Sequence, residues 1–156
     1  MKLKNYLLSI YLLCLPFISF SQTGMTYTVS ITSGGSARSY TYYVPSIYAV
    51  KDTLVPLIIN VHGFTGTSAQ QETAEDFRTI ADTANFLVLH PQALGSPLTS
   101  WDVWNTVASG AADRNYIMQC VDSIEAHFKI DTNRVYVTGF SQGGYMSYNL
   151  STNFSH

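Results

Sequence analysis

The sequence contains little charge and little cysteine. Only 12% of its 156 residues are charged, and the 8 basic and 10 acidic side chains are scattered along the chain, with a formal net charge of −2. This leaves no basic face that could bind phosphates, so a nucleic-acid partner has no support. The four histidines have no metal-ligand spacing, and therefore we expect no metal site. No repeat of solenoid length and no low-complexity linker divides the chain.

Residues 1–21 differ from the rest. Two lysines precede an apolar stretch over residues 6–20, which ends among small residues. This pattern is typical of a signal peptide, with cleavage expected near Ser21 or Gln22. Because the stretch is short for a membrane-spanning helix, we expect a secreted protein, extracellular or periplasmic, with no stable membrane insertion after cleavage. A retained anchor or lipid attachment at Cys14 are the alternatives.

Removal of that segment would leave Cys120 as the only cysteine, so no internal disulfide could form in residues 22–156. Stability must then come from packing. Hydrophobic residues make up 46% and aromatic residues 13% of the sequence, enough to build a core. We therefore expect one domain over residues 22–156.

Apolar patterning predicts an α/β fold. Partial alternation around a Gly-containing turn predicts an antiparallel hairpin from residues 25–31 and 38–44. Short apolar runs then alternate with segments of helical period, which is typical of βαβ units and a mostly parallel sheet. The expected strands are residues 57–61, 86–89 and 134–138. The expected helices are residues 68–84, with Phe77, Ile80, Ala81 and Ala84 on one face, and about 112–129, with Ile117, Val121, Ile124 and Phe128 at helical spacing.

The most specific chemical motif follows the last predicted strand. Gly139-Phe140-Ser141-Gln142-Gly143 fits G-x-S-x-G, and residues 144–150 after it can form a helix. The turn must be so tight that a Cβ at Gly139 or Gly143 would collide with a neighbouring element. The serine hydroxyl is then held at a helix N-terminus, which favours negative charge. Ser141 is therefore the predicted nucleophile; the structural alternative is an ordinary Gly-rich turn.

The segment His62-Gly63-Phe64-Thr65-Gly66 follows strand 57–61. Hydrolases with a G-x-S-x-G nucleophile build their oxyanion hole from a loop in this position. In these hydrolases one donor is the backbone N–H of the residue after the nucleophile, here Gln142, and another comes from the loop. We predict Gln142, together with Phe64 or Thr65, as the donors. His62 invites an interpretation as base or metal ligand, but we expect it to shape the loop.

Two tryptophans, Trp101 and Trp104, lie in the long loop after the strand that ends at His90. They could belong to the local core or line the substrate pocket, because a loop at this end of the sheet would lie over the active face. We expect His90 to be structural and His127, near a helix end, to be solvated.

Several segments carry a family resemblance, namely Pro56–Thr67, His90–Gln92, Ser100–Trp101, Asp113–Ile117 and Ile130–Ser147. The chain resembles the secreted polyhydroxybutyrate depolymerase and feruloyl/acetylxylan esterase group of α/β-hydrolases. This resemblance implies a Ser–His–Asp triad that cleaves carboxylic esters without a cofactor, with Ser141 as nucleophile and Gln142 as an oxyanion donor. Arg114 departs from the pattern, which usually has valine there.

In this fold the triad acid and histidine follow the nucleophile. No acidic residue follows Ser141, and a helix would carry the terminal His156 far from it. We therefore expect the N-terminal half only of an α/β-hydrolase domain, with a hairpin, βαβ units and the nucleophile elbow but without the C-terminal strands. Such a segment should be inactive and aggregation-prone alone, because strand 134–138 becomes an exposed edge.

Taken together, these features predict a secreted serine carboxylesterase acting through an acyl-enzyme on Ser141. The expected partner is a polymer-linked or aromatic ester of the polyhydroxyalkanoate or feruloyl/acetyl-xylan type, polymeric or small. Two alternatives stay open. One is a serine peptidase or lactone hydrolase on the same fold. The other is a non-catalytic module that binds a glycan or aromatic ligand through Trp101 and Trp104.

Overall fold

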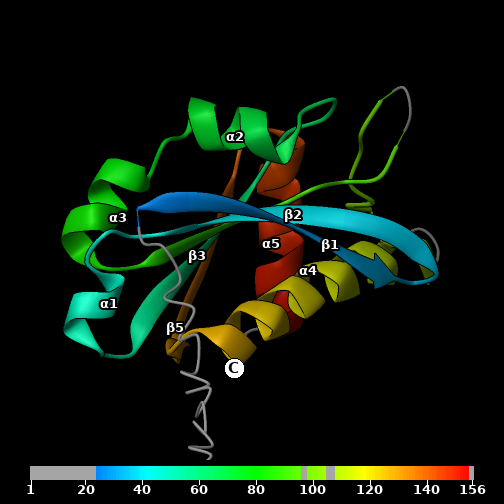
Figure 1. The fold of residues 1–156 in the computed structure, drawn as a ribbon. Helices are drawn as coiled ribbons and strands as arrows, with labels where there is room; N and C mark the ends of the chain where they lie inside the picture. Colours follow the sequence, from blue (N-terminus) through cyan, green and yellow to red (C-terminus); the bar gives the residue numbers. More distant parts are fainter. Residues whose placement is uncertain (1–23, 96–97, 105–107, 155–156) are drawn as a thin grey trace, which may run out of the picture.

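The computed structural model describes residues 24–95, 98–104 and 108–154. The predicted signal peptide, Cys14 and His156 lie outside these ranges. Five strands form one sheet in the order β1-β2-β4-β3-β5 (Figure 1). The strands are β1 (Met25–Ser33), β2 (Ser36–Val44), β3 (Val55–Val61), β4 (Leu87–Pro91) and β5 (Ile130–Gly139). The helices are α1 (Tyr48–Lys51), α2 (Ser68–Ala74), α3 (Arg78–Ala84), α4 (Ala108–His127) and α5 (Gln142–Phe154).

The predicted hairpin is confirmed. β1 and β2 pair antiparallel down to Ser33 opposite Ser36, so that only Gly34 and Gly35 form the turn. Both glycines have positive φ, 57° and 79°, as a two-residue turn that follows the twist of the strands requires. β2 also pairs antiparallel with β4, whereas β3 pairs parallel with β4 and with β5. The sheet is therefore mixed, with the hairpin extending its parallel part.

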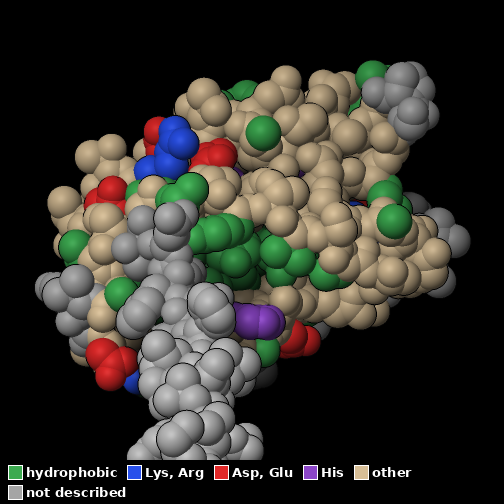
Figure 2. Space-filling model, viewed as in Figure 1, with side chains coloured by type: hydrophobic (Ala, Val, Ile, Leu, Met, Phe, Trp, Pro, Cys, Tyr) green, Lys and Arg blue, Asp and Glu red, His purple; other side chains and the backbone are tan. Residues whose placement is uncertain are grey.

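Alternate side chains of the central strands are buried on opposite faces of the sheet, as the strand period of two requires. Leu57 and Ile59 belong to the main core together with the inner faces of α4 and α5, whereas Ile58 packs in a second cluster with Ala81 of α3. Apolar side chains also gather between the hairpin and α4 (Figure 2), where the Tyr42 and Phe128 rings meet at 5.6 Å. Helices thus cover both faces, as parallel strands demand.

Residues 68–84 form two helices, so the prediction of one helix is wrong. Between α2 and α3 the Asp76 carboxylate accepts hydrogen bonds from the Arg78 backbone N–H (3.0 Å) and from its guanidinium (2.8 Å). A carboxylate that bonds the backbone two residues ahead offers that N–H an alternative to the helical ladder. Acidic and basic side chains lie side by side over this link (Figure 2).

The predicted apolar face of that segment is also wrong in part. Ala81 is fully buried and Phe77 half-buried, but Ile80 is 56% exposed and Ala84 is exposed. Because the helix is interrupted before Arg78, α3 has an axis of its own. The helical periodicity that was counted over residues 68–84 therefore does not predict which side chains of α3 are buried.

Helix α4 begins four residues before the predicted start and ends two residues before the predicted end. The four apolar residues predicted on its inner side, Ile117, Val121, Ile124 and Phe128, are all buried. Cys120 lies among them with no exposed surface, and burial raises the pKa of its thiol to about 12. This cysteine is therefore an interior packing residue.

Strand β5 is longer than predicted and forms an edge of the described sheet, which confirms the expected exposed edge. Tyr136 on this strand is 54% exposed. Beside β5 an open groove of about 640 Å³ runs between α4 and α5, lined by apolar residues such as Val135, Val137 and Leu150. Within the ranges that the structure covers, the helices are all too short or too polar to cross a bilayer.

The side chain of His90 predicts a pH-dependent stability. It is 1% exposed, and burial lowers its pKa to about 4 from an ordinary value of about 6.5. Because the folded-state pKa is the lower one, the stabilisation is present above pH ~6.5 and is lost as the pH falls toward ~4. We expect the free energy of unfolding to drop by up to about 3 kcal/mol in this window, measured by denaturant titration at each pH.

The control for this effect is a substitution of the same histidine. His90→Gln removes the titration, so its stability should depend less steeply on pH than that of the parent protein. Equal slopes in the two proteins would contradict the assignment to His90.

Candidate active site

The G-x-S-x-G segment forms the predicted strand–turn–helix. β5 ends at Gly139, α5 begins at Gln142, and the Gly143 N–H donates to the Phe140 carbonyl at 2.8 Å to close the turn. Ser141 has a φ of 53°, a left-handed conformation that residues with a Cβ rarely adopt. Ser141 is also exposed. The elbow therefore presents a strained, accessible hydroxyl at the first turn of a 13-residue helix.

The two glycines of the motif are required by close backbone contacts. A methyl group at Gly143 would lie 2.0 Å from the Val61 carbonyl oxygen, and one at Gly139 would lie 2.6 Å from the same oxygen. Both distances are far below a normal contact, as the sequence predicted. The element that leaves no room is the end of β3, which lies beside β5.

The loop that follows β3 lies directly against the elbow. The Phe140 N–H donates to the Val61 carbonyl at 3.2 Å, and a methyl group at Gly63 would lie 3.4 Å from the Ser141 Cβ. Two segments about 80 residues apart in the sequence are therefore side by side at the carboxyl ends of β3 and β5. This is the arrangement needed for loop amides to approach the serine.

Hydrogen bonding distinguishes the two predicted loop donors. The Thr65 N–H donates to the Thr99 carbonyl at 2.8 Å, so Thr65 is not a free donor in this structure and that alternative is corrected. Within the described ranges, the N–H groups of Phe64 and Gln142 donate to no protein acceptor. Phe64 and Gln142 are therefore the remaining pair of candidate oxyanion donors.

His62 has the structural role expected of it. Its Nδ1–H donates to the Gly63 carbonyl at 2.7 Å, and its Nε2 accepts from the Ala93 N–H at 3.0 Å. Both ring nitrogens are thus used, in a neutral tautomer, and burial lowers the pKa of the ring. His62 holds the shape of its loop and has no nitrogen left to serve Ser141.

The other described histidines are either buried or bonded elsewhere. His90 is buried at the end of β4, and the exposed His127 is bonded through Nδ1 to the Ser123 carbonyl at 2.7 Å. In the part of the chain that the structure covers, no histidine bonds to the Ser141 hydroxyl. Over the same residues no group of three His, Cys, Asp or Glu side chains could hold a metal ion.

The two tryptophans have different roles. Trp101 is 2% exposed, and its indole N–H donates to the His62 carbonyl at 2.8 Å, so of the two alternatives left open for it, core or pocket lining, the structure supports the core. Trp104 is 72% exposed, and its ring lies 5.8 Å from that of Tyr145 in the first turns of α5. Trp104 therefore remains the candidate for substrate contact.

Two site features were not predicted from the sequence. The Gln142 side chain bonds to Ser100 and Trp101, in addition to the predicted use of its backbone. Arg38 is buried in a 2.7 Å ion pair with Asp113. For Gln142 the sequence did contain a signal, because a carboxamide side chain directly after the serine can form hydrogen bonds to a neighbouring loop. Nothing in the alternation of β2 marks Arg38 as buried.

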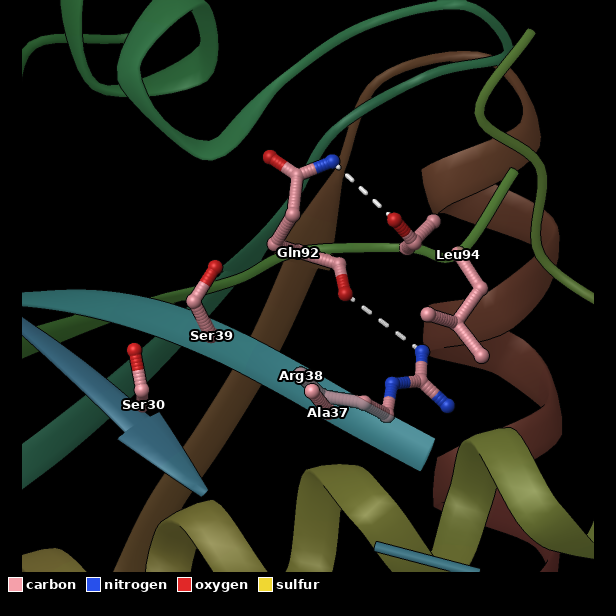
Figure 3. A pocket seen from close by; sticks show the side chains of 7 residues that line it. Ser30, Ala37, Arg38, Ser39, Gln92 and Leu94 are labelled. Carbon is pink, nitrogen blue, oxygen red and sulfur yellow. Dashed lines mark hydrogen bonds between the residues drawn. The ribbon is translucent and has the colours of Figure 1, made fainter. Parts of the chain in front are cut away.

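A pocket of about 250 Å³ next to Arg38 is separate from the elbow. Figure 3 shows Arg38, Gln92 and Leu94 among its lining residues, which come from the hairpin and from the segment that ends β4. Neither the elbow nor the loop after β3 contributes to it. The hollow is therefore not part of the arrangement around Ser141.

Comparison with known proteins relates this geometry to esterases. The family model described as esterase PHB depolymerase matches residues 38–155. A bifunctional acetylxylan esterase/xylanase of Neocallimastix patriciarum is 30% identical over 78% of this chain and 17% of its own length. Poly(3-hydroxyalkanoate) depolymerase C of Paucimonas lemoignei is 33% identical over 59% of this chain and 23% of its own length.

The fold is also similar to that of esterases with solved structures. The acetyl xylan esterase from Aspergillus awamori superposes with a TM-score of 0.70 at 23% identity, over 84% of this chain and 48% of that one. The predicted α/β-hydrolase fold is confirmed, and the chain contains a part of it. The chain spans less than half the length of each of these three proteins.

Proposed function

The chain belongs to the PHB depolymerase esterase family, and from that premise we propose that it carries the nucleophile of a secreted serine carboxylesterase, Ser141. The observation that carries the proposal is the position of this residue. Ser141 is exposed, in a strained turn at the start of α5, and its Cβ lies close to Gly63 in the loop that offers the free Phe64 N–H. Few structural roles would account for a strained, exposed serine in this position.

This geometry supports a reaction through an acyl-enzyme. The Ser141 oxygen attacks the ester carbonyl carbon, and its proton passes to a histidine base. The carbonyl oxygen becomes an oxyanion that accepts hydrogen bonds from the Gln142 and Phe64 N–H groups, each worth about 2.7 to 4 kcal/mol in the transition state. The alcohol leaves with the proton from the histidine, and water then releases the acid from the acyl-Ser141.

We propose that the histidine and the acid of the triad come from outside the described ranges. His62 and His127 are bonded to other groups, and His90 is buried at the end of β4. A form of the protein without that histidine should then be inactive, because a serine without its base loses most of its rate enhancement.

The proposed substrate is a polymer-linked or aromatic carboxylic ester. Relatives of this chain are called acetylxylan esterase and poly(3-hydroxyalkanoate) depolymerase. The exposed rings of Trp104 and Tyr145 offer an apolar surface on the helix that begins at the nucleophile. Sugar rings and aromatic acids both pack well on such rings.

The experiment that tests the proposal is acyl-enzyme trapping in the full-length protein. With p-nitrophenyl acetate we expect a burst of p-nitrophenol, and mass spectrometry of the quenched protein should place the acetyl group on the peptide that contains Ser141. An acetyl group on another residue, or none, would contradict the mechanism.

A substrate panel separates the alternatives. Faster cleavage of a peptide or a lactone than of acetylated xylan, feruloyl esters and polyhydroxybutyrate would favour the peptidase or lactone hydrolase. Glycan binding without hydrolysis, lost in Trp104→Ala, would favour the binding module.

A further inference from the structure

The segment Thr99–Trp101, called the brace below, is bonded to the loop that carries the Phe64 N–H. The Thr99 carbonyl accepts from the Thr65 N–H at 2.8 Å, and the Thr99 hydroxyl donates to the Gly66 carbonyl at 2.6 Å. The Trp101 indole N–H donates to the His62 carbonyl at 2.8 Å. Three hydrogen bonds therefore fix the loop on both sides of Phe64.

The same brace is bonded to the elbow through one side chain. The Gln142 Oε1 accepts from the Trp101 N–H at 3.0 Å, and its Nε2 donates to the Trp101 carbonyl at 3.1 Å. Nε2 also lies 2.9 Å from the Ser100 hydroxyl. Both ends of the carboxamide are thus held by the brace, on the residue whose backbone N–H is the other candidate oxyanion donor.

The brace is itself anchored in the core. The Asp102 N–H, next to the brace, donates to the Asp113 carboxylate at 2.8 Å. The other oxygen of that carboxylate is bound by Arg38 at 2.7 Å, and side-chain exposure is 2% for Arg38 and 11% for Asp113. Figure 3 shows the Arg38 guanidinium also directed to the Gln92 carbonyl. A buried ion pair therefore limits the movement of the brace relative to the sheet.

Backbone strain shows that the surroundings hold these segments tightly. Four described residues other than glycine have positive φ; Asp52 and Asn85 are the C-caps of α1 and α3. The other two are Ser141, at 53°, and Thr65, at 64°. Strained conformations persist where the surrounding contacts over-determine them. The brace contributes contacts to both segments, directly to Thr65 and through Gln142 to the elbow.

We propose that the brace sets the spacing between the Phe64 and Gln142 N–H groups, with the Trp101 indole and the Gln142 carboxamide as positioning residues of the oxyanion hole. This inference rests on the proposed function of Ser141. Oxyanion donors act over about 2.7 to 3.1 Å, and a misplacement of about 1 Å can cost on the order of 100-fold in rate. A brace that joins both donors supplies the required precision without touching substrate.

The test uses two substitutions in the full-length protein. Trp101→Phe keeps a buried aromatic ring but removes the bond to His62, and Gln142→Met keeps the length of the side chain but removes its bonds to the brace. We expect kcat for p-nitrophenyl acetate to fall by about 10- to 100-fold, with KM nearly unchanged. The affinity for a trifluoromethyl ketone, which forms a tetrahedral oxyanion on the serine, should fall by a similar factor.

Tyr40→Phe is the matched control. It removes a 2.8 Å hydrogen bond from a buried aromatic residue to Ser123 of α4, a bond that involves neither the brace nor the two donors. We expect it to lower stability somewhat while leaving kcat and ketone affinity near those of the parent protein. If Trp101→Phe does not fold, Gln142→Met carries the test, since its side chain is only half-buried.

The outcomes separate this inference from the proposed function. A parent protein without Ser141-dependent hydrolysis would overturn the proposed function. A parent protein with that activity, together with brace variants whose kcat and ketone affinity match the Tyr40→Phe control, would overturn the brace alone. Loss of kcat without loss of ketone affinity would overturn it as well.

Discussion

Replacing Ser141 with alanine should abolish ester hydrolysis in the full-length protein. The substitution removes the atom proposed to form the acyl-enzyme, and the loss expected for a serine nucleophile is on the order of 10⁶ in kcat. Alanine also has no hydroxyl to react with a fluorophosphonate probe, so labelling should disappear with activity. Initial rates with p-nitrophenyl acetate and in-gel detection of the probe measure both effects.

The control for this variant is a serine on the same helix. Ser151→Ala removes a hydroxyl that is bonded to the Ser147 carbonyl at 2.9 Å, three turns from the nucleophile. Its activity should stay within about two-fold of the parent, as for most surface changes. If Ser141→Ala retained a tenth of the parent activity, the nucleophile would have to be another residue.

Replacing Gly143 with alanine should disrupt the elbow. The new methyl group would lie 2.0 Å from the Val61 carbonyl oxygen and 2.7 Å from that of His62, and both are backbone atoms of a buried strand and its end. Neither can move without shifting β3. We expect a loss of about 3 kcal/mol or more in the free energy of unfolding, together with loss of activity. Denaturant titration and the ester assay measure the two effects.

The adjacent glycine provides the comparison. A methyl group at Gly144 would approach only the Gly139 carbonyl oxygen, at 3.3 Å, so a small adjustment suffices. Alanine in place of glycine inside α5 also favours the helix by about 1 kcal/mol, which offsets that adjustment. Gly144→Ala should therefore be close to neutral. Equal stability of the two variants would mean that β3 does not lie against the elbow as described.

The sequence predicted the elements whose signals are local. The turn at Gly34 and Gly35 needs only two residues that accept positive φ. The glycines of the elbow follow from a single close backbone approach. The amphipathic face of α4 could be predicted because that helix is long and uninterrupted, and its four expected core residues are buried. Such signals need no knowledge of distant partners.

The wrong prediction and the alternatives that stayed open depended on contacts between distant residues or on competing local bonds. Asp76 divides the expected helix because its carboxylate bonds Arg78, and helical periodicity does not report such a bond. Trp101 is buried because its indole reaches the His62 carbonyl, 39 positions earlier, which no pattern in its own loop indicates. Thr65 could be separated from Phe64 only by the bond of its N–H to Thr99.

The buried thiol of Cys120 can report how often helix α4 separates from the sheet. A thiol that has no exposed surface and a pKa raised to about 12 presents almost no thiolate to an alkylating reagent while α4 is docked. Iodoacetamide modification at this position would then proceed only through molecules in which α4 has left the sheet. The labelling rate, followed on the peptide that contains Cys120, would measure how often that happens under native conditions, without any introduced probe.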